Sequence, residues 1–149
     1  MSGDITVPHS ITALILYALW VLALVLMVAA DRVLTVLKGE AQITSFTPGT
    51  PHGSDSYWRL NRAHMNAAEN LAIFAVVVLS GWAIGLETVN FNRLGVIVVC
   101  ARIVQSFIHI ISGAAWAIYL RFAAYAVQIV CIVWMAVLIL QQAGLFGGP

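Results

Sequence analysis

Four long apolar runs dominate the pattern of hydrophobic and polar positions along the chain. They cover residues 11–30, 63–86, 94–118 and 122–143, and charged or turn-forming residues separate them. Each run reaches the roughly 20 residues that an α-helix needs to cross the hydrocarbon core of a bilayer. A spanning helix satisfies its own backbone groups, and no segments of alternating polarity suggest barrel strands. The pattern predicts an all-α transmembrane four-helix bundle that forms a single domain over residues 1–149.

The amino-acid composition favours an integral membrane protein over a water-soluble or disordered chain. Apolar residues account for 62% of the 149 residues and charged residues for 9%, whereas soluble domains carry about 25% charged residues. Seven Lys and Arg face six Asp and Glu, so the net charge is +1 and no nucleic-acid partner is expected. The first run is too long for a cleavable signal peptide and no Lys or Arg precedes it, so we expect it to remain as a span.

Basic residues are distributed unevenly over the connections between the runs. The longest connection, residues 31–62, carries Arg32, Lys38, Arg59 and Arg62. On the same side of a four-span bundle lies Arg121, whereas the opposite side has only Arg93. Because Lys and Arg are enriched in cytoplasmic loops, we expect residues 31–62 to be cytoplasmic and both termini to face the other side. In a bacterial cell this membrane would be the inner membrane.

Polar side chains inside three of the runs lie on one face of each helix. In the second and third helices, each set spans an arc of about 80° at about 100° per residue. The sets are Arg59, Arg62, Asn66 and Glu69 in the second helix, Arg102, Gln105, His109 and Ser112 in the third, and Arg121, Tyr125 and Gln128 in the fourth. Ionisable groups inside a membrane are costly and usually face a protein interior or a wet cavity. We therefore expect these stripes to meet in the cytoplasmic half of the bundle.

Two interpretations of the polar stripes remain open at this point. In one, they only stabilise the bundle, with Arg102 and Glu69 as a buried ion pair and the other groups hydrogen-bonded between helices. In the other, they line a pocket whose arginines bind carboxylates and whose Glu69 binds an ammonium group. Such a pocket suits a small anionic, peptide-like ligand. In both, Arg102 needs a partner, either Glu69 or a carboxylate of another subunit, because an unpaired arginine is costly in a membrane.

A motif in the second run resembles that of a known family. Arg62-Ala63, Asn66 and Glu69 match the R-A-x-x-N-x-x-E pattern in the second helix of the MAPEG family, the membrane-associated proteins of eicosanoid and glutathione metabolism. The four spans, the long first cytoplasmic loop and the expected orientation are similar as well. The resemblance therefore covers nearly the whole chain.

Two further helices carry weaker matches to the same family. Arg102 and Gln105, followed by His109, look like the third-helix arginine of the family and its polar followers. Arg121 and Tyr125 are similar to the arginine and tyrosine that begin the fourth helix in the prostaglandin E synthase branch.

The resemblance implies a homotrimer that takes glutathione as its co-substrate at subunit interfaces near the cytoplasmic side. Family residues that match Asn66 and Glu69 hold the tripeptide, and we expect Arg62 to help position it. We expect Arg121 to stabilise the glutathione thiolate and Tyr125 to act in the same site, as the two catalytic residues. A cation beside a thiol favours the thiolate, which is the nucleophile. The predicted glutathione-binding set is completed by Arg102, Gln105 and His109.

Three positions depart from the pattern of the family. Met65 stands where some eicosanoid-branch members have an extra arginine, and Gln42 stands where they have a basic residue near the end of the first helix. Both changes remove charge complementarity to a glutathione carboxylate. Gln105 stands where the prostaglandin branch has a histidine. The chain thus looks like a divergent, bacterial-type member.

The function that the resemblance implies is that of a membrane-bound glutathione transferase or peroxidase, acting on a lipophilic electrophile or a lipid hydroperoxide. The alternative, favoured by Met65 and Gln42, is a non-catalytic lipid-binding or scaffold protein of the same fold, because the family contains such a member. A small transporter or channel fits less well, since no charge continues through the second helix beyond Glu69.

Membrane lipids are expected partners of such a chain, and a metal is not. The four histidines are scattered and none forms an i, i+4 pair, so no metal site is predicted. Cys100 and Cys131 fall inside the third and fourth runs. We expect both to be buried thiols that pack as small apolar residues.

Overall fold

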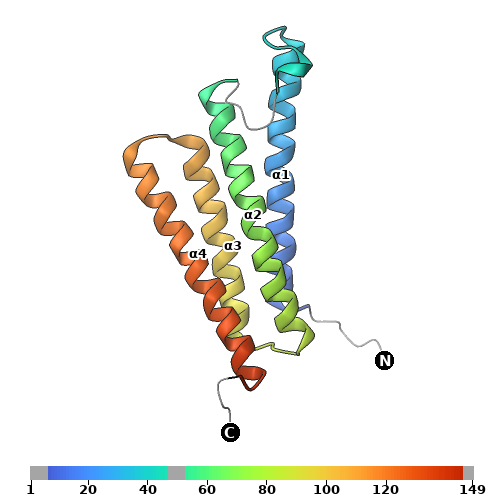
Figure 1. The fold of residues 1–149 in the computed structure, drawn as a ribbon, viewed down its shortest axis with the longest axis vertical. Helices are drawn as coiled ribbons and strands as arrows, with labels where there is room; N and C mark the ends of the chain where they lie inside the picture. Colours follow the sequence, from blue (N-terminus) through green and yellow to red (C-terminus); the bar gives the residue numbers. More distant parts are fainter. Residues whose placement is uncertain (1–6, 47–52, 146–149) are drawn as a thin grey trace, which may run out of the picture.

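The computed structural model describes residues 7–46 and 53–145, and within them the secondary structure is entirely helical. The four long helices are each long and apolar enough to cross a membrane, which confirms the predicted all-α four-helix bundle. A short 3-10 helix lies between the first two (Figure 1). In chain order the elements are α1 (His9–Leu37), η1 (Ile43–Ser45), α2 (Asp55–Ala83), α3 (Val89–Ile111) and α4 (Ala115–Gln142).

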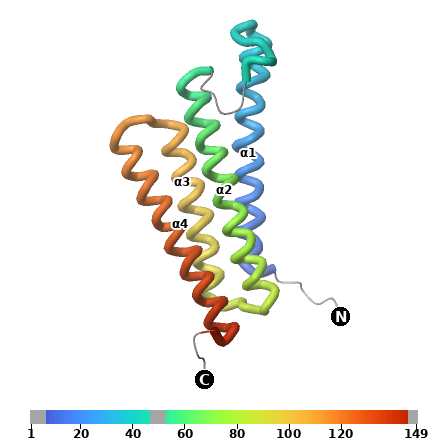
Figure 2. The backbone as a smooth tube through the Cα atoms, in the orientation of Figure 1, coloured from blue at the N-terminus to red at the C-terminus, as the bar shows by residue number. Residues whose placement is uncertain are grey.

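The helices are arranged with α2 and α3 in the middle and α1 and α4 on the flanks (Figure 2). The first helix packs against both α2 and α3, whereas α4 packs mainly against α3 and more lightly against α2. The start of α1, the α2–α3 link and the end of α4 lie at one end of the bundle (Figure 1). The α1–α2 connection and the α3–α4 link lie at the other end, which we call the loop end.

Helix boundaries follow from side-chain caps and from glycine. The Ser54 hydroxyl accepts a hydrogen bond from the Tyr57 backbone N–H across 3.2 Å and so begins α2, with Asp55 in the first turn as the helix dipole favours. Helix α2 ends where Gly85 adopts a φ of 70°, a left-handed conformation that costs glycine little. The following backbone N–H of Leu86 then bonds back to the Gly81 carbonyl across 2.8 Å, as in a helix-terminating turn.

The connection between the first two helices is shorter than the loop expected over residues 31–62. Helix α1 continues through Arg32 to Leu37, and α2 already begins at Asp55. The apolar run predicts only the part of the helix that lies in hydrocarbon. The helix itself can continue beyond this run as long as its backbone hydrogen bonds are satisfied. Of the connection itself, residues 47–52, which include most of its Pro and Gly, lie outside the described residues.

The protein interior is concentrated where α1, α2 and α3 meet. Tyr17 of α1 and Phe74 of α2 are fully buried, and their ring centroids are 5.6 Å apart. Nearer the α2–α3 link, Phe91 of α3 covers Gly81 of α2 so closely that a Cβ on the glycine would lie 2.3 Å from the ring. These contacts hold α1, α2 and α3 together and leave one side of α2 and α3 for α4.

Candidate functional site between α2, α3 and α4

A cavity of about 370 Å³ opens between α2, α3 and α4. Six of the eight residues predicted for the site line it together: Asn66, Glu69, Gln105, His109, Arg121 and Tyr125. The structure therefore gathers side chains from three helices into one space, as the polar stripes predict. Its remaining lining residues are Asn70, Ile118 and Phe122.

The charged and hydroxyl groups of the cavity are accessible, whereas its floor is buried. Asn66, Glu69 and Tyr125 are exposed and Arg121 is half-buried. Gln105 at the base is only 8% exposed. Thus a guanidinium, a carboxylate, an amide and a phenol are all available to a ligand that enters from outside.

Gln105 is held in place by hydrogen bonds to α4. Its Nε2 donates to the backbone carbonyl of Arg121 across 3.1 Å, and its Oε1 accepts from Gln128 Nε2, also at 3.1 Å. The same Gln128 nitrogen donates to the Ala124 carbonyl at 2.9 Å. This pair of amides sets the position of the first turns of α4, and with it the position of Arg121, relative to α3.

Asn70 is a cavity residue that the sequence reasoning missed. Its side chain is 6% exposed, and its Nδ2 has no hydrogen-bond partner among the described residues. A buried donor without a partner costs about 1–3 kcal/mol, so this nitrogen is available to a polar group in the cavity. The spacing from Asn66 was a usable signal, because residues four apart share one helix face. The apolar pair Ile118 and Phe122 has that spacing too.

Arg102 does not form the ion pair with Glu69 that the sequence analysis offered as its simplest partner. Its side chain is 1% exposed and does not line the cavity. The guanidinium carbon lies 5.8 Å from the centroid of the Tyr17 ring on α1. Its Nε and Nη2 have no hydrogen-bond partner within residues 7–46 and 53–145. Arg102 lies two turns along α3 from His109, about 10 Å at about 1.5 Å per residue, and at that position its neighbour is Tyr17 of α1.

Arg62 also lies away from the cavity. It is exposed, and its guanidinium carbon is 5.6 Å from the centroid of the Trp58 ring, one turn earlier in α2. Helical side chains tilt toward the N-terminus of their own helix, which brings Arg62 back over Trp58. Arg59 links α2 to α3, since its Nε donates a hydrogen bond to the Ile110 carbonyl at 3.1 Å. Arg121 is therefore the one arginine of the described residues on the cavity wall.

The two cysteines differ in their surroundings. Cys131 is buried, as expected, but Cys100 is exposed on α3, so the expectation of two buried thiols is wrong for it. The apolar run could not distinguish these positions, because both the interior and the lipid-facing surface of a membrane protein are apolar.

Comparison with known proteins places the chain in a family. No curated protein matches the chain at a significant level. The sequence profile of the MAPEG family matches residues 10–141, which include all four long helices except the first residue of α1 and the last of α4. The chain therefore belongs to the MAPEG family.

Proposed function

We propose that this integral multi-pass membrane protein is a glutathione-dependent enzyme, a transferase or peroxidase, whose glutathione site is the cavity between α2, α3 and α4. Membership of the MAPEG family supports a function of the membrane glutathione-transferase type or a related one. The observation that carries the proposal is the meeting of Glu69, Arg121 and Tyr125 in one cavity.

The groups in the cavity complement the chemistry of the tripeptide. Glutathione has two carboxylates, one ammonium group and a thiol, which supplies a nucleophile when it is deprotonated. The Glu69 carboxylate suits the ammonium group, and the amides of Asn66 and Asn70 suit the peptide bonds and carboxylates. The Arg121 guanidinium favours the thiolate over the thiol, and the Tyr125 hydroxyl can donate a hydrogen bond to sulfur.

The lipophilic second substrate would reach the same place from the membrane. Ile118 and Phe122 add apolar surface to the polar cavity, and Phe122 is 71% exposed on α4. A bound electrophile or lipid hydroperoxide could thus contact apolar side chains while its reacting atom lies near Arg121. Proximity and orientation of this kind contribute much of the rate in two-substrate reactions.

We further propose that the active form is a homotrimer with the cavity at a subunit interface and the loop end in the cytoplasm. The half-open state of the cavity in one protomer supports this, since Glu69 and Asn66 are exposed. Five of the seven Lys and Arg residues are in the parts of α1, α2 and α4 nearest the loop end or in the α1–α2 connection (Arg32, Lys38, Arg59, Arg62 and Arg121), which favours the cytoplasm for that end.

Calorimetry in detergent with reduced glutathione tests the binding site. We expect Glu69→Gln and Arg121→Gln each to weaken binding about tenfold or more, the factor that loss of one charge-assisted hydrogen bond gives. Lys38→Gln, which removes an exposed cation outside the cavity, should bind like the parent. Parental affinity in both cavity variants would place glutathione elsewhere.

A non-catalytic lipid-binding or scaffold role is the second candidate. It is favoured by the position of Arg62 over Trp58, because Arg121 is then the single described cation on the cavity wall. Turnover of a chromogenic aryl halide separates the two functions. An enzyme should lose most of its rate in Arg121→Ala, whereas a scaffold shows no turnover in the parent protein even where glutathione binds.

A further inference from the structure

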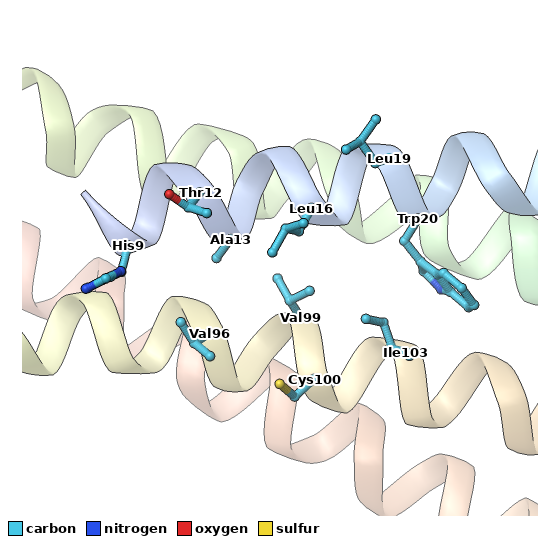
Figure 3. A pocket seen from close by; sticks show the side chains of 10 residues that line it. All are labelled: His9, Thr12, Ala13, Leu16, Leu19, Trp20, Val96, Val99, Cys100 and Ile103. Atoms are coloured by element: carbon cyan, nitrogen blue, oxygen red, sulfur yellow. The ribbon is translucent and has the colours of Figure 1, made fainter. Parts of the chain in front are cut away.

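A second cavity lies between α1 and α3 (Figure 3). A cavity of about 430 Å³ is lined by these two helices alone, with Leu16 and Val99 facing each other across it. Another of about 530 Å³ lies toward the start of α1 and α3. Because both are lined by His9 and Val96, the two cavities adjoin, and together we call them the α1–α3 groove.

The walls of the α1–α3 groove are mainly apolar, and Trp20 lies at its inner end. Leu16 is 52% exposed and Val96 is 44% exposed, so the groove opens on the outer surface of the protomer. At the inner end, Trp20 Nε1 donates to Ser106 Oγ across 3.2 Å. The Trp20 ring packs against that of Phe107, with centroids 5.3 Å apart. The indole N–H is therefore satisfied, and an occupant meets only the apolar part of this side chain.

The outer end of the α1–α3 groove carries a positive charge. Arg93 lines it together with Asn92 and His9. Arg93 is exposed and makes no hydrogen bond or ion pair with the described part of the chain. Among the residues that the structure describes, it is the only Lys or Arg at the end where α1 and α3 begin.

At the outer end, α1 and α3 are joined by a hydrogen bond and packed against each other. Asn92 Oδ1 accepts a hydrogen bond from the Ser10 backbone N–H across 2.9 Å, which joins the first turn of α1 to α3. Beside it, α1 and α3 are in contact at Gly95, where a Cβ would lie 3.4 Å from Ser10 Cα, an ordinary van der Waals distance.

The length of the α1–α3 groove matches one leaflet of a bilayer. His9 and Trp20 at its two ends are eleven residues apart on α1, which is about 16 Å at about 1.5 Å per residue. The hydrocarbon core of a bilayer is about 30 Å thick. An acyl chain whose head group lies at Arg93 would therefore reach Trp20 near the bilayer midplane.

From this charge and shape we propose that the α1–α3 groove binds one anionic membrane phospholipid. Its phosphate contacts Arg93, and one acyl chain lies between α1 and α3 as far as Trp20. An arginine fork matches the geometry of a phosphate, and the apolar walls exclude the polar ligand proposed for the opposite cavity. The site lies in the leaflet away from the loop end, so it is separate from the proposed glutathione site.

Native mass spectrometry of the protein released from nanodiscs measures the selectivity. With phosphatidylglycerol and phosphatidylcholine in equal amounts, we expect preferential retention of phosphatidylglycerol. Arg93→Gln should reduce that preference about tenfold, the loss expected for one charge-assisted contact. Arg93→Lys and the charge-matched control Lys38→Gln should retain it, and Val96→Trp, which fills the groove without changing charge, should abolish it. Equal retention of both lipids, or an undiminished preference in Arg93→Gln, overturns the proposal.

Photo-crosslinking with a phosphatidylglycerol that carries a diazirine on its acyl chain locates the site. We expect adducts in the peptides that contain residues 12–20 and 96–103. Adducts confined to α2 or α4, or a groove that crosslinks to a second copy of the chain instead of lipid, contradict the proposal. Glutathione binding by Arg93→Gln should remain parental in the same preparations, which distinguishes failure of this site from failure of the proposed function.

Discussion

Gln105 Nε2 donates a hydrogen bond to the backbone carbonyl of Arg121 across 3.1 Å, and so one buried amide of α3 sets the position of the cavity arginine on α4. The Gln105 side chain is in turn oriented by Gln128. A buried polar group without a hydrogen bond destabilises the bundle. This contact therefore holds α3 and α4 in a fixed register at the cavity.

We expect Gln105→Leu to reduce the turnover number more than it changes the affinity for glutathione. The substitution keeps the volume but removes the contact with α4, so Arg121 is present yet less well placed. The loss of stability should be about 1 kcal/mol, as for one hydrogen bond. Steady-state kinetics on the aryl halide, with unfolding in a detergent titration, measure both effects.

The matched control for this prediction is Gln142→Leu, the same change at an exposed glutamine at the far end of α4. This control should change neither the turnover number nor the stability. A Gln105→Leu variant with a parental turnover number and a weaker affinity would instead make Gln105 a direct ligand of glutathione.

Gly81→Ala should destabilise the bundle. Its new Cβ would lie 2.3 Å from the Phe91 ring, and overpacking of this kind costs about 1–3 kcal/mol. Replacing Phe91 with leucine in the same protein should recover part of the loss, because the smaller side chain yields space. Detergent-induced unfolding of the single and double variants gives the coupling energy.

Gly113→Ala serves as the control for Gly81, since a Cβ at Gly113 meets no atom within 4 Å. Equal losses at the two glycines would show that backbone effects, rather than the Phe91 contact, determine the cost.

The orientation of the bundle can be tested at two exposed glutamates. Glu40 lies at the loop end, and Glu87 lies in the α2–α3 link at the opposite end. With Cys100 and Cys131 changed to alanine, we expect Glu87→Cys in intact cells to react with a membrane-impermeant thiol reagent. Glu40→Cys should react only after the membrane is opened. The reverse pattern would invert the orientation, and reaction of both in intact cells would contradict four spans.

Most of the fold was predictable because each span can be recognised from its own stretch of sequence. An apolar run of sufficient length has few alternatives in a membrane, and the residues between runs must form connections. The exact helix ends were not predictable from hydropathy alone. Helix α1 continues past Arg32 to Leu37, although a helix outside the hydrocarbon core does not need apolar side chains.

The polar stripes were predictable as faces but not as contacts. Gln105, His109 and Arg102 share an arc of α3, yet Gln105 and His109 line the cavity while Arg102 lies against Tyr17. His109 is only about 20° from Arg102 around the helix but about 10 Å from it along the axis, and the sequence does not say which side chains of other helices lie at each position.

The order of apolar and polar residues was thus sufficient for the number of helices, the family motif and the residues that avoid lipid, because these depend on chemistry within a single helix. Packing alone decided that Arg62 turns back over Trp58, that Asn70 reaches the cavity, and that Cys100 is exposed. The physical reason is that both the interior and the membrane are apolar, so hydrophobicity identifies a buried or lipid-facing position without distinguishing them.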